Sequence, residues 1–210
     1  MKISQYLLII FLPITIILCN LLPLVYSNSF YTTIYKKENI YQNFRSTIEV
    51  DNATKELVSY FRGQNNLDGN FYSTQSILHL TDVKNIFDAL IIINALSILS
   101  AFAAFLYLNL KKKRSVIRKS LILGCIVATC FVLIAFILSL LNFDAFFVYF
   151  HKVLFRNDLW LFNQNDNLIK LFPIEFFIAF TKQLTINILI SVLLILSVAH
   201  LLPKHDSTTI

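Results

Sequence analysis

The sequence predicts an all-α membrane protein with four transmembrane helices and two extracytoplasmic loops containing short interfacial helices. Hydrophobic residues make up 57% of the 210-residue chain, whereas ordinary soluble domains are about 45–50% apolar. These residues gather in four runs, each close to the roughly 20 mostly apolar residues that a membrane crossing needs. The third observation is a strongly basic linker between the second and third runs, which is typical of a cytoplasmic loop.

The four apolar runs cover about residues 6–26, 87–110, 121–141 and 176–202. A secretory signal peptide is the alternative for the first run, but its apolar part exceeds the usual ~7–15 residues and no A-x-A cleavage site follows. We therefore expect a retained helix, kinked or ended at Pro13 or Pro23. The chain is then a single integral membrane domain over residues 1–210.

The charge distribution predicts the orientation of the spans. Six basic residues lie in the linker at about residues 111–120 and equal the whole net charge of +6: Lys111, Lys112, Lys113, Arg114, Arg118 and Lys119. The positive-inside rule places this linker in the cytoplasm, and four spans then place both termini there. Outer loops follow at about residues 27–86 and 142–175. A nucleic-acid partner is not expected, since the basic excess is explained by topology.

Both outer loops carry signals for short helices. Residues 51–62 form an amphipathic pattern, with Asp51 or Asn52 as the candidate cap and Gly63 as the candidate stop. The capping-type residues at 73–76 predict a helix that carries His79 directly into the second span. In the second outer loop, the aromatic segment 143–155 predicts an interfacial helix and residues 163–167 predict a turn. Pro173 and Glu175 suit the first turn of the fourth span.

Two histidines are the candidate chemical groups. His79 and Asp82 are three positions apart, so on a helix they share a face, where the carboxylate can hold one ring nitrogen and fix the tautomer. His151 emerges from an aromatic, apolar segment, where desolvation shifts its pKa. The structural alternative for each is a satisfied interfacial histidine.

Two further residues are candidates for supporting or substrate-orienting roles. Lys84 either serves polar groups of a substrate or simply pairs with Asp88 four positions later. Trp160 is otherwise explained as an interfacial anchor.

Several reaction classes lack their usual residues. The chain has 3 glycines and no phosphate-binding loop, and no G-x-S-x-G motif occurs. Its cysteines, Cys19, Cys125 and Cys130, all lie in apolar runs, so neither a disulfide framework nor a zinc set is expected. A metal site from His79, Asp82 and His151 is conceivable but lacks H-E-x-x-H spacing. An acyl-transfer enzyme without an internal nucleophile would take the nucleophile from its substrate.

Two separated motifs in the outer loops resemble the bacterial lipoprotein intramolecular transacylase family, Lit. The first is HLTDVK at residues 79–84, and the second is FHKVLF at residues 150–155, followed by Trp160, Phe162, Asp166 and LFP at 171–173. The resemblance covers nearly the whole chain. One departure is that relatives often carry an acidic residue shortly before the first histidine, where this chain has STQS at residues 73–76.

The resemblance implies a specific reaction in the bacterial cytoplasmic membrane. Diacylglyceryl-modified lipoproteins are the implied substrates, and their sn-2 acyl chain moves to the α-amine of the N-terminal cysteine, giving the lyso form. No cofactor or metal is required. His79 and His151 are the implied catalytic pair on the extracytoplasmic side, with His79 expected as the base. The alternatives are a non-enzymatic transport or assembly protein, which the apolar span centres disfavour, and a metal-dependent membrane hydrolase.

Overall fold

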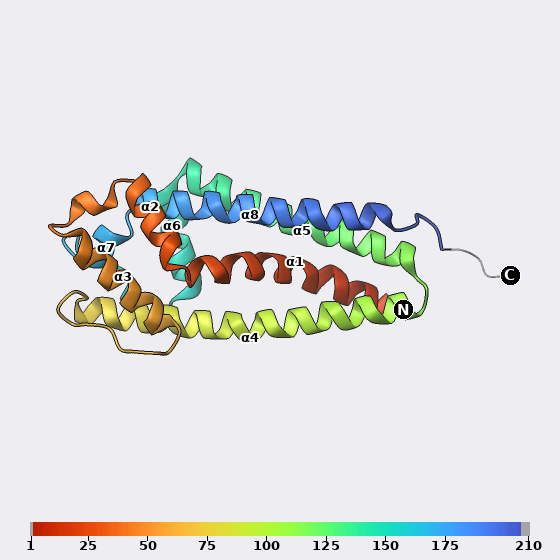
Figure 1. The fold of residues 1–210 in the computed structure, drawn as a ribbon, viewed down its shortest axis with the longest axis horizontal. Coiled ribbons are helices and arrows are strands. Elements are labelled where there is room, and N and C mark those ends of the chain that lie inside the picture. Colours follow the sequence, from red (N-terminus) through yellow and green to blue (C-terminus); the bar gives the residue numbers. More distant parts are fainter. Residues whose placement is uncertain (1, 207–210) are drawn as a thin grey trace. The chain divides into compact units, whose positions relative to one another are not determined.

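The computed structural model describes residues 2–206, which fold into helices joined by loops and turns. The elements in chain order are α1 (Lys2–Val25), α2 (Asn28–Lys37), the 3-10 helix η1 (Ile40–Asn43), α3 (Thr47–Phe61), α4 (Thr74–Leu110), α5 (Arg114–Leu141), α6 (Phe143–Leu154), α7 (Asn167–Leu171) and α8 (Ile174–Leu201) (Figure 1). No strand occurs within residues 2–206, so the predicted all-α class is confirmed.

Four helices, α1, α4, α5 and α8, are long and apolar enough to cross a membrane, as predicted. Helix α4 has 37 residues, and at ~1.5 Å per residue its length exceeds the roughly 30 Å hydrocarbon core of a bilayer. Its charged residues, Asp82, Lys84 and Asp88, all lie in the first half, so we assign residues 89–110 as its membrane-spanning part. His79 therefore lies outside the span, on the helical extension that the capping residues at 73–76 predicted.

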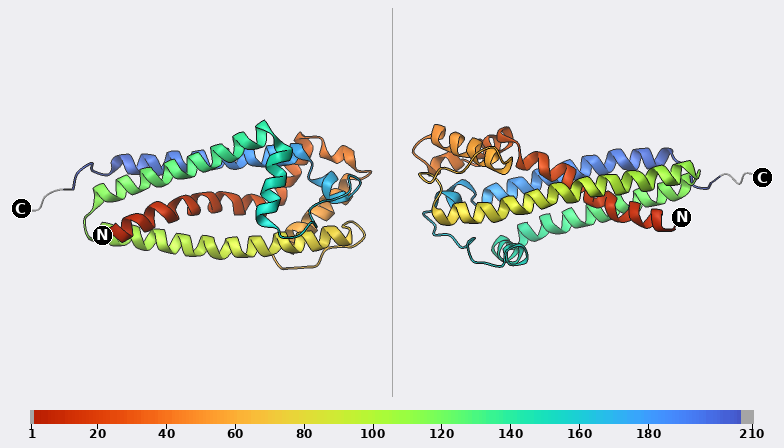
Figure 2. Two further views of the ribbon diagram at one scale, coloured as in Figure 1. Left: turned by 180° about the vertical axis from the view of Figure 1, so that it is seen from behind. Right: turned by 90° about the horizontal axis from the view of Figure 1, so that it is seen from below.

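The chain divides into two compact units. The first unit contains residues 2–21, 90–135 and 184–206 of the described chain. All four long helices contribute to its core, which includes Leu12 of α1, Leu108 of α4, Cys125 of α5 and Ile188 of α8. Figure 2 shows these helices as ribbons in two further views. A Cβ at Gly124 would lie 2.8 Å from Leu12 Cδ2, so the glycine is what lets α5 approach α1 this closely.

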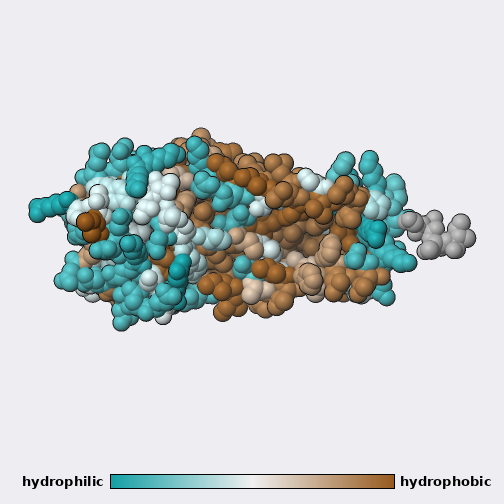
Figure 3. Space-filling view, in the orientation of Figure 1, coloured by the Kyte–Doolittle hydropathy of each residue, from teal (hydrophilic) through white to brown (hydrophobic). Residues whose placement is uncertain are grey.

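The surface of the first unit is suited to lipid. Large apolar side chains are exposed along α4, including Ile92, Leu99 and Phe102. In Figure 3 the brown, hydrophobic surface covers the middle of the molecule, and teal, hydrophilic surface gathers toward both ends. Polar side chains instead bond between helices: Asn20 Nδ2 donates to Ser191 Oγ at 3.0 Å. Such hydrogen bonds between helices are expected in a hydrocarbon environment, because lipid tails offer polar groups no partners.

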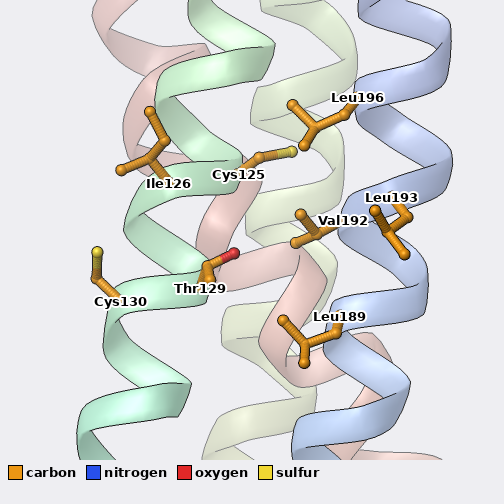
Figure 4. Close-up of a pocket in the computed structure, with 8 residues that line it drawn as sticks. All are labelled: Cys125, Ile126, Thr129, Cys130, Leu189, Val192, Leu193 and Leu196. Atoms are coloured by element: carbon orange, nitrogen blue, oxygen red, sulfur yellow. The ribbon is translucent and has the colours of Figure 1, made fainter.

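An apolar groove of about 460 Å³ lies between α5 and α8 within this first unit (Figure 4). Its lining residues are Cys125, Ile126, Thr129, Cys130, Leu189, Val192, Leu193 and Leu196. Two thiols and one hydroxyl are the polar groups of this lining, which offers no carboxylate, imidazole or ammonium group for acid–base chemistry.

The second unit contains residues 22–89 and 136–183. It has a core of its own, in which Tyr35, Leu57, Val58 and Tyr72 are almost completely buried. Tyr72 anchors α3 by donating from its hydroxyl to the Ala53 carbonyl at 2.8 Å. Both candidate histidines belong to this unit.

The predicted cap of the amphipathic helix between α1 and α4 is wrong. Helix α3 begins at Thr47 because Ser46, in extended conformation, accepts from the Glu49 N–H through its side chain. Asp51 lies inside the helix and accepts a hydrogen bond from the Tyr41 hydroxyl. Gly63 follows the helix with a φ of 73°, which confirms it as the stop.

The segment between α5 and α8 agrees with its predicted elements. Helix α6 matches the aromatic segment and is capped by Asn142, whose side chain accepts from the Ala145 N–H at 3.0 Å. The predicted turn at residues 163–167 leads into the short helix α7, capped by Asp166. Helix α8 begins at Ile174, so Glu175 lies in its first turn as predicted, whereas Pro173 directly precedes the helix. Helix α1 passes through Pro13 and ends at Val25, shortly after Pro23.

Candidate active site

His79 and His151 face each other inside the second unit. His79 is on the helical extension of α4 and His151 is in the last turn of α6. Their rings are stacked, with centroids 6.0 Å apart and planes inclined by 29°. Each residue is only 7% exposed. The structure therefore brings together the two side chains that the sequence singled out.

Aromatic rings enclose the histidine pair. The Phe155 ring lies 4.9 Å from the His79 ring and 5.6 Å from the His151 ring, centroid to centroid. Phe162 lies 5.5 Å from His79. Phe147 and Trp160 cover His151 at 3.9 and 5.0 Å. This enclosure removes water from both imidazoles and leaves few polar groups to compete for them.

The protonation pattern of His151 follows from one hydrogen bond. Its Nδ1 lies 2.8 Å from the carbonyl oxygen of Phe147, one turn earlier on α6. A carbonyl oxygen can only accept, so Nδ1 carries the hydrogen and donates it. In the neutral ring Nε2 then holds the free lone pair. By contrast, the buried Nδ1 of His79 has no hydrogen-bond partner among the described residues.

The pKa of His79 is lowered to about 4, mainly by burial and also by the neighbouring His151, while the Asp82 carboxylate opposes both. Burial also lowers the pKa of His151 from its ordinary value of 6.5, against the opposing hydrogen bond to Phe147. Both rings are therefore neutral at pH 7. A neutral imidazole can accept a proton at one nitrogen and donate a hydrogen bond from the other.

The expected hydrogen bond between Asp82 and a ring nitrogen of His79 is not formed. Asp82 Oδ2 instead accepts from Asn157 Nδ2 at 2.9 Å. The backbone carbonyl of the same Asn157 accepts from Trp160 Nε1, also at 2.9 Å. Asp82 thus acts on His79 through its charge, and it orders the loop that carries Trp160. Sequence spacing identified the shared helix face but not the partner that the loop supplies.

The other two candidates are also placed. Lys84 forms an ion pair with Asp88, with Nζ 2.6 Å from Oδ2, which confirms the predicted helix-surface pair. This interaction raises the pKa of Lys84. Trp160 is only 5% exposed and packs on His151, so it is part of the wall around the pair rather than a surface anchor.

Side chains at the start of α4 hold the surrounding loop. Gln75 Nε2 donates to the carbonyls of Leu159 and Leu161, at 3.0 and 2.9 Å, on either side of Trp160. Ser73 Oγ and Ser76 Oγ donate to the two oxygens of Asp166, at 2.6 and 2.8 Å. Sequence reasoning interpreted residues 73–76 as capping types and missed these long-range partners.

Comparison with known families decides the classification. The model of the family described as lipoprotein intramolecular transacylase Lit matches residues 6–177. The chain belongs to this family. The match spans both motifs, the whole of α4 and α5 and most of α1, so the predicted resemblance is confirmed.

Solved structures of Lit from Bacillus cereus agree with the assignment. One in meso structure of that membrane integral transacylase matches with a TM-score of 0.84 and 28% identity, covering 95% of this chain and 94% of that one. A second, of a variant with one histidine replaced by arginine, matches with a TM-score of 0.80 and 26% identity, covering 95% and 90% of the two chains. No curated protein sequence matches the chain.

As a Lit family member, the protein is a membrane-integral acyltransferase. The three ligands considered for a metal, His79, Asp82 and His151, do not form such a group, and no set of three or more metal-ligating side chains gathers anywhere in residues 2–206. The assembled features are a pair of neutral imidazoles and a dry aromatic enclosure, which together suit proton transfer on an apolar substrate.

Proposed function

We propose that His79 and His151 jointly catalyse the intramolecular transfer of the sn-2 acyl chain of a diacylglyceryl lipoprotein to the α-amine of its N-terminal cysteine. Family membership supplies the reaction class. The observation that carries the site assignment is the stacking of the two buried imidazoles at 6.0 Å within an aromatic enclosure. The product is the lyso form, which is N-acylated and retains one acyl chain on the glyceryl group.

The reaction balances without a group from outside the substrate. The amine nitrogen attacks the carbonyl carbon of the sn-2 ester, so a C–N bond forms and the C–O bond to the glyceryl oxygen breaks. The proton that the nitrogen loses is returned to the glyceryl oxygen. One base that later acts as an acid is enough for both transfers. Holding amine and ester together supplies much of the rate, because the attack is intramolecular.

The geometry favours His151 as the base, the reverse of the assignment expected from the sequence. Its Nδ1–H is engaged by Phe147, which leaves Nε2 free to accept the amine proton and deliver it to the leaving oxygen. The same Phe147 carbonyl stabilises the imidazolium form between these two steps. His79, neutral and without a partner at Nδ1, is suited to donate a hydrogen bond to the ester oxygen as negative charge develops there.

The lowered pKa values of the two histidines also determine the protonation state in which the α-amine reacts. An α-ammonium has a pKa of about 7.7–8.0, so an imidazole whose pKa is lowered by burial is a poor base toward it. The amine therefore attacks as the neutral form. Its acidity rises once the C–N bond forms, and His151 removes the proton at that stage.

We further propose that this unit of the protein faces outward from a bacterial cytoplasmic membrane, with both termini in the cytoplasm. The basic linker that joins α4 to α5 supports this orientation. Reporter fusions after residue 113 and after residue 65 test it. We expect cytoplasmic activity from the first and extracytoplasmic activity from the second, and the opposite result would reverse the topology.

The function is tested in cells that lack other N-acylating activity. Mass spectrometry of a lipoprotein N-terminus should show the lyso form with the wild-type protein. His79→Ala and His151→Ala should leave the diacylglyceryl form with a free amine, whereas His200→Ala in α8 serves as a matched control and should retain activity. If the lipoprotein keeps its diacylglyceryl group and free amine although wild-type protein is present at normal level, the transacylase assignment for this substrate is refuted.

A further inference from the structure

A small cavity with charged walls adjoins the histidine pair in the second unit. Its volume is about 250 Å³, and its lining residues are Asp82, Asn85, Ile86, Leu154, Phe155, Arg156 and Asn157. The shared wall is Phe155, whose ring also contacts both imidazoles. The volume is below the ~300–1,000 Å³ of pockets for whole small-molecule ligands. The cavity therefore fits one end of a larger substrate.

Two opposite charges line this cavity without neutralising each other. Asp82 accepts one hydrogen bond, from Asn157 to Oδ2. Arg156 makes no hydrogen bond or ion pair with any described residue, and the ion pairs formed within residues 2–206 are Lys37–Glu38 and Lys84–Asp88. A carboxylate and a guanidinium that share a cavity but do not pair leave both groups available to a ligand that carries a cation or N–H donor and a separate acceptor.

We propose that this cavity binds the amino-terminal peptide end of the lipoprotein, with the α-amine at Asp82 and the first peptide carbonyl at Arg156. The inference rests on the proposed function, which requires the amine to lie beside the histidines. A carboxylate accepts an N–H from either the ammonium or the neutral amine, so Asp82 holds the group before and after its proton leaves. The guanidinium and the amides of Asn85 and Asn157 offer donors to peptide carbonyls.

This placement assigns the two ends of the substrate to different surroundings. The acyl ester lies against the aromatic wall of the histidine pair, and the peptide backbone leaves through the polar cavity. Phe155 separates the two compartments and touches both. Asp82 and Arg156 are then positioning residues that select a free N-terminus, which is the feature that distinguishes this substrate from an ordinary diacyl lipid.

A zwitterionic phospholipid headgroup is the competing occupant, since it also carries a cation and an anion. The lining favours the peptide because Arg156 is its single cationic side chain, while two neutral amides complete the polar wall. Phosphate sites usually gather several basic or backbone donors around the anion. Phosphatidylethanolamine, which carries such a headgroup, therefore serves as the direct competitor in the binding test.

Three unreactive ether ligands test the contact of the α-amine with Asp82 independently of the contact of the peptide carbonyl with Arg156. The first is S-dialkylglyceryl-cysteinyl-serine amide, whose ether chains cannot transfer. The second is its desamino analogue, which lacks the α-amine. The third is S-dialkylglyceryl-cysteamine, which retains the amine but lacks the peptide carbonyl. Their inhibition constants are measured against turnover of the diacyl form of the first compound, with Trp160 fluorescence as the binding readout where a variant is too slow.

We expect wild-type protein to prefer the first ligand over each of the other two by about tenfold or more, the range for a hydrogen bond to a charged group. Asp82→Asn should remove the preference for the amine, and Arg156→Gln should remove the preference for the carbonyl. Asp158→Asn changes the same charge on a side chain that does not line the cavity, and should keep both preferences.

The proposal is overturned if Asp82→Asn and Arg156→Gln retain both preferences while wild-type protein converts the diacyl compound. It is also overturned if vesicles of phosphatidylethanolamine displace the first ligand and phosphatidylglycerol vesicles do not, because the cavity is then a headgroup site. Failure of wild-type protein to convert the diacyl compound at all would instead refute the proposed function.

Discussion

The Nδ1 of His151 lies 2.8 Å from the carbonyl oxygen of Phe147 and must donate to it, which leaves Nε2 as the free base of the site. This single contact distinguishes the two histidines, because the Nδ1 of His79 has no such partner among the described residues. The backbone of the aromatic helix α6 therefore sets which ring nitrogen of His151 carries the hydrogen.

The protonation of His151 should be visible through Trp160. Trp160 is the chain's only tryptophan and its ring lies 5.0 Å from His151. An imidazolium quenches indole emission more strongly than a neutral imidazole. Because burial lowers the pKa of His151 below 6.5, we expect emission to fall on acidification with a midpoint below that value.

His151→Gln should remove this fluorescence step, and His200→Gln should leave it unchanged. A midpoint at or above pH 6.5 in wild-type protein would show that the enclosure does not desolvate His151 as the structure requires.

Stability should fall on acidification because of His79. Its pKa is lowered to about 4 in the folded protein from 6.5, so between these values the unfolded chain binds the proton more readily. The contribution is complete above pH 6.5 and is lost as pH falls toward 4. Thermal unfolding in detergent at pH 7 and pH 5 should show a smaller decrease for His79→Gln than for wild type. An equal decrease in both proteins would contradict the burial of this imidazole.

Asp166 should be essential for the stability of the second unit. Its oxygens accept from Ser73, from the fully buried Ser76 and from the Leu168 N–H. Replacing it with alanine removes the acceptor of the buried Ser76 hydroxyl and of the Leu168 N–H, and a buried unpaired donor costs about 1–3 kcal/mol, whereas Ser73 still donates to Ser76 Oγ. Denaturant unfolding of Asp166→Ala, Ser76→Ala and the double variant measures the coupling. We expect the double variant to lose less than the sum of the two, and strict additivity would argue against the contact.

Gln75 should affect catalysis by positioning Trp160. Gln75→Leu removes both hydrogen bonds to the carbonyls of Leu159 and Leu161. A displacement near 1 Å can cost up to about a hundredfold in rate, so we expect kcat to fall by about ten- to a hundredfold with a smaller change in KM. The emission of Trp160 should move to longer wavelength as water enters. Gln42→Leu, at an exposed position on η1, is the control, and unchanged emission in Gln75→Leu would contradict the role.

Much of the architecture follows from local sequence. The spans are evident because each needs a long apolar run in which every backbone group bonds internally. The extension of α4 was predictable from the capping types before His79, and the end of α3 from Gly63. Two histidines in otherwise apolar surroundings were enough to identify the centre of the site.

The contacts around that centre were not predictable, because their partners are remote in sequence. Asp82 shares a helix face with His79, but its hydrogen bond goes to Asn157 in the segment between α6 and α7. Serine is a residue type that often caps helices, yet the Ser76 hydroxyl donates a hydrogen bond to Asp166 instead. The base assignment changed for the same reason: spacing favoured His79 beside Asp82, whereas the backbone carbonyl that orients His151 leaves no signal in side-chain identity.

A double-mutant cycle on the two histidines tests their joint role most directly, with transfer of the acyl chain measured on a purified diacylglyceryl peptide. General acid–base groups contribute about 10²–10⁴-fold to rate, and residues that act as a unit are strongly non-additive. We expect His79→Ala and His151→Ala each to lose activity in that range, and the double variant to lose little more than the worse single variant. Losses that multiply in the double variant, or a single variant with wild-type activity, would contradict a joint catalytic pair.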